Sequence, residues 1–157
     1  MIIGIDPGSS GAAAFMASNE LLHVVRFIRK TPLQIACELC DAINDVHCTG
    51  EPIVYMEFTS SSPQMGVRSA HTFGRKSGQL EGMFAMLGVE PAYVPPRTWQ
   101  KALGVQPSRK KMGTGNTDHK RTLRRLAEEL YPDWKMTADQ ADAILIAEYG
   151  RRLRGGE

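Results

Sequence analysis

The sequence predicts one α/β domain in which helices cover both faces of a mixed five-stranded sheet whose first three strands are antiparallel. Three short apolar runs joined by tight turns come first, and helical and strand-like patterns alternate after them. The 157 residues, 42% of them hydrophobic and 23% charged, suffice for one buried core and are too few for two domains. We expect the domain to span residues 1–153, with a short tail over 154–157.

The first three elements are expected to form an antiparallel meander. β-Branched residues make 2–6 a buried strand, and a turn over 7–11 with two glycines leads into a strand of small residues over 12–17. A second short turn leads to a strand over 21–28. Strands joined by turns this short pair with antiparallel neighbours.

Helices and strands alternate along the rest of the chain. A helix is expected from Thr31-Pro32 to about residue 46, because proline is favoured in the first helical turn. A fourth strand over 53–57 follows the break at Gly50. The other expected elements are a loop over 58–66, a helix over 68–87 ended by Gly88, a strand over 92–94, a helical turn over 98–103, a glycine-rich basic segment over 104–116, and helices over 117–130 and 137–153.

Four acidic residues lie beside strongly apolar segments. Asp6 ends the first expected strand and Glu57 ends the fourth, so the two meet if those strands are parallel neighbours. Asp139 and Asp142 share one face of the last helix, just after its expected N-cap Thr137. Four converging carboxylates cannot all stay ionised without cations. We therefore expect a site for two Mg²⁺ ions, with Mn²⁺ as a substitute.

Two metal ions predict phosphodiester hydrolysis, one activating water and the other stabilising the leaving 3′ oxygen. Lys120 is expected near the scissile phosphate to stabilise developing charge, and simple tethering of phosphate is an equal alternative. Single acids also have structural interpretations, Asp6 as a turn former and Asp139 as a partner of the helix dipole. Glu57, at the end of a buried strand, has no such explanation.

Basic residues are concentrated in one stretch of the chain. Residues 97–125 hold nine Lys or Arg and one acid, a net charge of +8, which leaves the rest near −6 for an overall +2. Such a region predicts contact with a phosphate backbone, and solvated helix faces are the alternative. The expected DNA-binding side chains are those of Arg68, Arg75, Lys76, Arg97, Lys101, Arg109, Lys110, Lys111, Lys120, Arg121 and Arg124.

The cysteines favour a reducing compartment. Cys37, Cys40 and Cys48 are odd in number, which fits the cytosol better than a disulfide framework. Together with His47 they suggest a zinc site, but we prefer to interpret Cys37 and Cys40 as small buried hydrophobes on a helix. The chain begins directly on a strand, and no apolar stretch approaches the roughly 20 residues that span a bilayer, so no membrane partner is expected.

These motifs, in this order, resemble one nuclease family. Ile-Gly-Ile-Asp-Pro-Gly at 3–8, Glu57 and Asp139-x-x-Asp142 are similar to the motifs of RuvC-type Holliday junction resolvases, which are ribonuclease-H-like nucleases. The small-residue helix over 69–78 is also similar to one in that family. Pro96-Arg97-x-Trp99-x-Lys101, and Lys120 before a helix, resemble its bacteriophage-type branch.

The resemblance implies a homodimer that makes symmetric nicks in four-way DNA junctions, in a bacterial cell or a phage-infected host. It places Mg²⁺ at the four carboxylates and requires no nucleotide cofactor. In the family an aromatic residue after the catalytic Glu wedges into the junction centre; here Phe58 follows Glu57, with a core position as the alternative. The helix over 68–87 is the expected dimer element, because its glycines allow close approach, although packing on its own sheet is also open.

Three other functions are weighed against junction resolution. A less selective nuclease for forks and flaps would use the same chemistry, and only its substrates would distinguish it. A non-catalytic junction-binding protein would have lost an acid, whereas all four are present. An actin-like ATPase or sugar kinase shares the opening motif, but it needs a second lobe for which 157 residues leave no room.

Overall fold

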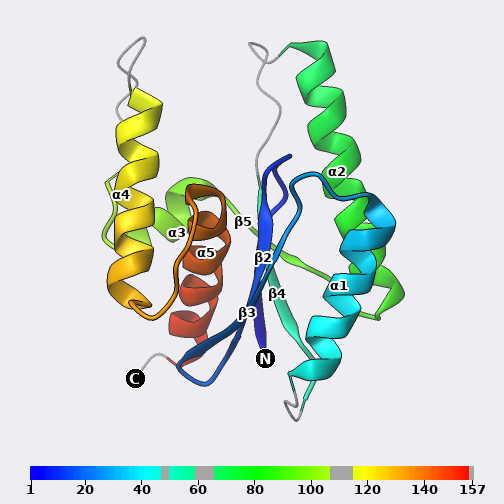
Figure 1. Ribbon diagram of the computed structural model, residues 1–157, viewed down its shortest axis with the longest axis horizontal. Helices are drawn as coiled ribbons and strands as arrows, with labels where there is room; N and C mark the ends of the chain where they lie inside the picture. Colours follow the sequence, from blue (N-terminus) through cyan, green and yellow to red (C-terminus); the bar gives the residue numbers. More distant parts are fainter. Residues whose placement is uncertain (47–49, 59–65, 107–114, 156–157) are drawn as a thin grey trace.

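A computed structural model describes residues 1–46, 50–58, 66–106 and 115–155. Its centre is a five-stranded sheet in the order β3-β2-β1-β4-β5 (Figure 1). β1 pairs antiparallel with β2 and β2 with β3, whereas β1–β4 and β4–β5 are parallel pairs. This confirms the mixed sheet that the sequence predicts. The strands are β1 (Ile2–Asp6), β2 (Ala12–Ala17), β3 (Glu20–Arg26), β4 (Ile53–Glu57) and β5 (Ala92–Val94).

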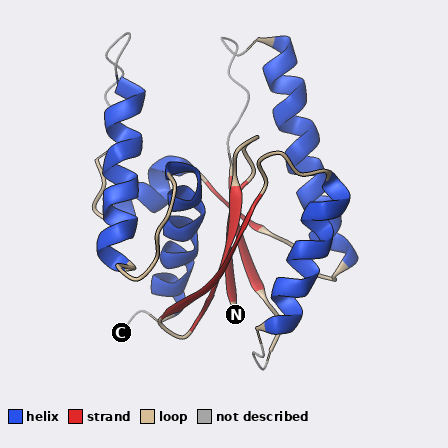
Figure 2. Cartoon of the chain, in the orientation of Figure 1, coloured by secondary structure: helices blue, strands red, loops and turns tan. Residues whose placement is uncertain are grey.

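Helices cover both faces of the sheet (Figure 2). One face carries α1 (Pro32–Asp45) and α2 (Val67–Met86), and the other carries α3 (Pro96–Ala102), α4 (Gly115–Leu130) and α5 (Ala138–Arg154). A separate apolar core fills each side. The alternation of side chains along β1 explains this division: Ile3 and Ile5 enter the core beneath α1 and α2, whereas Gly4 faces α5.

The close approach of α5 to β1 depends on small residues. A Cβ added to Gly4 would lie 2.2 Å from the backbone nitrogen of Ala147 and 2.4 Å from the carbonyl oxygen of Ala143. Ile144 and Ile146 of this helix are fully buried. The contact therefore fixes where the first turn of α5 lies relative to the end of β1.

Several element boundaries differ from expectation. β3 ends at Arg26 rather than residue 28, because the chain turns at Arg29, whose φ is 58°. The short helix starts at Pro96 rather than 98, since proline fits the first helical position. α5 runs to Arg154, one residue into the expected tail. Gly88, with φ of 74°, follows the end of α2 as predicted.

The interpretation of the helical cysteines as buried hydrophobes is wrong. Cys37 and Cys40 are exposed free thiols on the outer side of α1, where Leu33 is also 73% exposed. The side of α1 that faces the core is formed by Ile35, Leu39 and Ala42. His47 and Cys48 lie outside the described residues.

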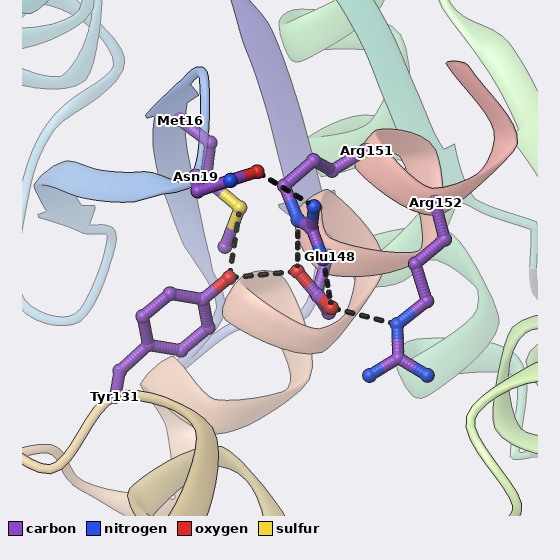
Figure 3. Close-up of polar contacts among 6 residues, drawn as sticks. All are labelled: Met16, Asn19, Tyr131, Glu148, Arg151 and Arg152. Carbon is purple, nitrogen blue, oxygen red and sulfur yellow. Dashed lines mark hydrogen bonds and ion pairs between the residues drawn. The ribbon is translucent and has the colours of Figure 1, made fainter. Parts of the chain in front are cut away.

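A buried ion network stabilises the second half of α5 (Figure 3). Glu148 is 1% exposed and accepts hydrogen bonds from Arg151 at 2.6 and 2.9 Å, from Arg152 at 2.7 Å and from the Tyr131 hydroxyl at 2.7 Å. Arg151 also donates to Asn19 in the β2–β3 turn at 2.8 Å. Burial raises the pKa of the Glu148 carboxyl, but these donors outweigh burial and lower it to about 2. The network links α5 to the α4–α5 connection and to the meander.

Among the described helices, none has the length and apolar character needed to cross a membrane.

Candidate functional site

Asp6 occupies the end of β1, where a tight turn wraps around its carboxylate. The Gly8 backbone N–H donates to Asp6 Oδ1 at 2.9 Å. Gly11 completes the turn by donating to the Gly8 carbonyl at 2.9 Å. A Cβ at Gly11 would lie 1.9 Å from the Asp6 carbonyl oxygen, so only glycine fits there. The Pro-Gly-Ser-Ser-Gly sequence thus holds Asp6 in place.

Glu57 lies beside Asp6 at the end of the neighbouring parallel strand. The register pairs Ile5 with Met56, so Asp6 and Glu57 are the next residues along β1 and β4. Side chains alternate along a strand, which directs Asp6 to the same side as Gly4, the side covered by α5. This is the adjacency that the sequence predicts for two parallel strand ends.

Asp139 and Asp142 enter the same corner from the first turns of α5. A capping box fixes the start of this helix, in which the Thr137 backbone N–H donates to Gln140 Oε1 at 2.8 Å. In Figure 1 the start of α5 and the end of β1 both face away from the two chain termini, between α2 and α4. The predicted N-cap is confirmed, and it presents both aspartates toward the strand ends.

The acids raise one another's proton affinity. Burial raises the pKa of Glu57 to about 7, with repulsion from Asp6 and Asp142 adding to the effect and a hydrogen bond from Trp99 opposing it. Burial and repulsion from Asp6 likewise raise the pKa of Asp142 to about 7. The pKa of Asp6 is also raised, chiefly by burial and further by Asp139. The four carboxylates therefore share one electrostatic environment.

Lys120 is the basic residue that faces this corner. It lies in the second turn of α4, and its positive charge lowers the pKa values of Asp6 and Asp142. The pKa values of both acids stay raised despite Lys120. One ammonium group is therefore too little charge to bring the pKa of Asp6 or Asp142 back to its ordinary value.

The donor set fits a hard divalent cation. Carboxylate oxygens are the ligands that Mg²⁺ and Mn²⁺ prefer, and a bound cation would offset the burial and mutual repulsion that raise the pKa values of Glu57 and Asp142. Within the described ranges, no three His, Cys, Asp or Glu side chains already lie at metal-ligand spacing. The four acids are electrostatic neighbours rather than a closed cage, and metal binding would require their side chains to draw together.

The predicted DNA-binding Lys and Arg side chains that the structure describes lie on three helices, α2, α3 and α4. Arg97 and Lys101 are exposed on α3, and Arg68 and Arg75 are exposed on α2. Lys76 donates to the Ser9 carbonyl at 3.1 Å, which ties α2 to the turn after Asp6. The segment that holds Arg109, Lys110 and Lys111 lies outside the described residues.

The basic face of α4 is partly neutralised along the helix itself. Arg121 pairs with Asp118 at 3.3 Å, and Arg124 pairs with Glu128 at 2.8 Å. Exposed pairs of this kind contribute little, so a phosphate can displace the acid at small cost. Acidic partners on α4 therefore neutralise part of the positive charge of residues 97–125.

Phe58 is not a core residue. Its side chain is 51% exposed and meets Tyr93 of β5 edge-on, with ring centroids 6.0 Å apart. The core alternative weighed for Phe58 is therefore wrong. The aromatic side chain stands at the surface directly after Glu57, and its role as a junction wedge stays a prediction.

Sequence reasoning missed the contact of Trp99 with the site. The Trp99 indole N–H donates to Glu57 Oε1 at 3.1 Å, and the side chain is fully buried. A buried tryptophan needs an acceptor for its N–H, which is a usable signal. The two partners are 42 positions apart in the sequence, so the sequence does not show which acceptor the indole finds.

Comparisons with known proteins find a match in shape alone. No family model and no curated protein matches the sequence. The structure of T. thermophilus RuvC in complex with Holliday junction substrate matches with a TM-score of 0.67 and 18% identity, covering 99% of this chain and 95% of that one. A second Thermus thermophilus RuvC structure matches with a TM-score of 0.61 and 18% identity over 99% and 96%. These similarities confirm the ribonuclease-H-like fold; the bacteriophage-type branch stays a prediction.

Proposed function

We propose that this chain is a divalent-metal-dependent endonuclease that resolves four-way DNA junctions by symmetric nicks. The observation that carries the proposal is the corner where Asp6, Glu57, Asp139 and Asp142 meet with their charge unbalanced. The ribonuclease-H-like fold, shared over nearly the whole length of a RuvC that was solved with a Holliday junction, supports the choice of substrate.

The four carboxylates would hold two Mg²⁺ ions. When bound, the ions supply an activated attacking water and charge neutralisation at the leaving 3′ oxygen. The chain's own residues prepare this site: the Gly8 N–H restrains Asp6, and the docking of α5 on Gly4 brings in Asp139 and Asp142. Burial on the α5 side of the sheet keeps water from screening these charges.

Lys120 is assigned to the scissile phosphate. Its ammonium group is near enough to Asp6 and Asp142 to lower the pKa values of both. A phosphate oxygen that gains charge during attack would be stabilised at this position. Binding of the DNA backbone falls to the exposed cations of α2, α3 and α4, among them Arg75, Arg97 and Arg124.

Helix α2 is assigned to a homodimer interface. Gly74, Gly78 and Gly82 lie on one exposed face, and apart from the adjoining backbone of α2 itself no heavy atom of the described chain lies within 4 Å of a Cβ built at any of them. Val67 and Met86, near the two ends of the helix, are 87% and 91% exposed. A second copy of this helix can approach such a face closely, and a two-fold enzyme suits a two-fold junction.

Sedimentation analysis tests the dimer. Gly78→Arg should convert the dimer to a monomer, because the new side chain fills the open face. Asn44→Arg, on the exposed side of α1, is the matched control and should remain a dimer. A wild-type monomer at micromolar concentration, with or without junction DNA, would refute this assignment.

Cleavage of end-labelled four-way junction, fork, flap and linear duplex tests the activity. Each substrate is incubated with Mg²⁺, with Mn²⁺ and with EDTA. The proposal expects paired, symmetric nicks in the four-way junction that disappear in EDTA. Equal cutting of forks and flaps would reassign the chain as a general branch nuclease, and tight binding without cutting would make it a junction-binding protein.

A further inference from the structure

Trp99 is tied to the site by a single, well-defined contact. The residue lies in α3, is 0% exposed, and donates its indole N–H to Glu57 Oε1 at 3.1 Å. A buried indole N–H requires an acceptor, and a carboxylate gives a stronger hydrogen bond than a neutral carbonyl. Here the acceptor is one of the four acids of the candidate site rather than a backbone group.

The position of Trp99 is rigidly determined by the chain around it. Pro96 occupies the first turn of α3, and the extended backbone of Pro95 joins this helix directly to β5. The Thr98 N–H donates to the Pro95 carbonyl at 2.9 Å, and the Trp99 side chain packs in the core beneath α5. The indole therefore reaches Glu57 from a fixed platform.

Glu57 is restrained from two directions. The backbone just after it is held because the Phe58 N–H donates to the Val94 carbonyl at 2.9 Å, extending the β4–β5 ladder. The side chain is held at Oε1 by Trp99. Asp6 has the same arrangement, with Oδ1 bonded to the Gly8 N–H. In both acids one oxygen accepts a hydrogen bond, and the other accepts none from a side chain or N–H in the part of the chain that the structure describes, which leaves it open to a ligand.

We propose that Trp99 is a positioning residue that orients Glu57, so that Oε2 is presented to a divalent cation. This inference rests on the proposed function and adds a residue that acts through Glu57 without touching DNA. A fixed carboxylate loses less side-chain freedom when it binds a cation. Groups that orient a metal ligand in this way typically change metal affinity by about 10–100-fold when they are removed.

Calorimetric titration of Mn²⁺ into the full chain tests the proposal. Trp99→Phe keeps most of the aromatic volume and removes the N–H donor, so Mn²⁺ affinity should fall by about 10–100-fold. Trp134→Phe is the matched control, since Trp134 lies in the α4–α5 connection, and its affinity should stay within about twofold of wild type. Four-way junction binding in EDTA should be unchanged in both variants, because Trp99 is buried away from the DNA.

A second measurement leaves Trp99 in place and therefore does not depend on how Trp99→Phe folds. In Trp134→Phe, Trp99 is the single tryptophan of the chain. Paramagnetic Mn²⁺ should quench its fluorescence with a midpoint equal to the calorimetric affinity, and EDTA should restore it. In Trp99→Phe, the fluorescence of Trp134 should respond much less.

The outcomes separate this inference from the proposed function. If Trp99→Phe binds Mn²⁺ as wild type does, or if Trp99 fluorescence stays constant while Mn²⁺ saturates the protein, the positioning role is overturned and the nuclease proposal survives. If wild type binds no Mn²⁺ at all, both fail. Weakened binding together with saturable quenching supports the inference.

Discussion

Helix α5 carries buried acids near both ends, and the protein treats them in opposite ways. Near its C-terminal end, two arginines and a tyrosine surround Glu148, and the pKa of that carboxyl falls to about 2. At its start, Asp142 shares a corner with Asp6 and Glu57, and the pKa values of Asp142 and Glu57 rise to about 7. Glu148, at 1% exposure, is nevertheless less exposed than Asp142 or Glu57.

The cations around an acid distinguish a structural role from a candidate functional role more clearly than the burial of that acid does. The chain supplies cations for the acid that holds the fold together, so Glu148 needs nothing from outside. For the acids at the strand ends, the described part of the chain supplies Lys120, and the pKa values of Asp6 and Asp142 stay raised beside it. Perturbed acids of this second kind mark candidate functional sites, and their residual charge is what a divalent cation would neutralise.

The largest expected effect is the loss of cleavage when one strand-end acid is neutralised. Asp142→Asn should reduce four-way junction cleavage by roughly 10³-fold or more, because the metal's contribution to the transition state amounts to several kcal/mol. Junction binding in EDTA should persist, since it rests on basic side chains. Asp41→Asn, an exposed acid on α1, is the control and should cut normally. Near wild-type cleavage by Asp142→Asn would remove this residue from the site.

Removing the cation of the same corner should have the next largest effect. Lys120→Ala should slow junction cleavage by about 10²-fold, the usual loss for one charge-stabilising donor, with a much smaller change in binding. Arg125→Ala, which removes an exposed cation from the same helix, should weaken binding slightly and leave the cleavage rate at saturation unchanged. Equal losses of binding and rate in Lys120→Ala would favour the tethering role instead.

Neutralising an acid should change stability in opposite directions at the two ends of α5. Glu148→Gln should lower the free energy of unfolding by about 3 kcal/mol, since it breaks a buried ion network. Asp142→Asn should raise that free energy in EDTA, because it relieves repulsion among the strand-end acids. Glu129→Gln, in an exposed pair with Arg125, should change it by less than about 1 kcal/mol. Urea unfolding of the three variants measures the difference, and destabilisation by Asp142→Asn would contradict the contrast.

The pH dependence of stability should also divide the two regions. Glu57 and Asp142 keep their protons in the folded protein up to about pH 7, whereas the unfolded chain loses them near their ordinary pKa values of 4.5 and 3.8. Folding therefore takes up protons in between, and stability in EDTA should fall as the pH rises from about 4 to about 7.

Glu148 behaves in the opposite way, because its pKa is lowered from 4.5 to about 2. Its stabilisation is complete above its unfolded pKa and should be lost as the pH falls toward 2. Urea unfolding across pH in wild type, Asp142→Asn and Glu148→Gln separates the two contributions. In Asp142→Asn, the free energy of unfolding should decline less as the pH rises toward 7. In Glu148→Gln, it should decline less as the pH falls toward 2. An unchanged pH dependence in either variant would refute the corresponding pKa shift.

The fold was predictable because its local signals agree with one another. Apolar runs of strand length predicted the strands, and the glycine-rich turn after Asp6 predicted the first reversal of chain direction. The docking side of α5 follows from its apolar pattern, and Thr137 was recognisable as its N-cap. The predicted end of β3 was wrong because the backbone angle of one residue decides it. Arg29 has a positive φ, which the sequence does not signal.

The sequence predicted that the acids come together, but it did not predict their contacts with neighbouring side chains. Asp6 and Glu57 end two apolar runs, and a parallel pairing brings such ends together without further information. The contact between Trp99 and Glu57 depends instead on how α3 packs after β5, a tertiary outcome that no local pattern encodes. The same holds for the Glu148 network, whose partners Asn19 and Tyr131 lie far from it in the chain.

The central claim is that the strand-end acids form a site for divalent cations, and Mn²⁺ calorimetry with wild type and Asp142→Asn at pH 8 tests it most directly. This pH lies above the pKa values of about 7 of Glu57 and Asp142, so we expect saturable binding by wild type that Asp142→Asn weakens by at least about 10-fold. Glu148→Gln, folded under the same conditions, should bind as wild type does. Absence of binding by wild type, or equal binding by Asp142→Asn, would contradict the account.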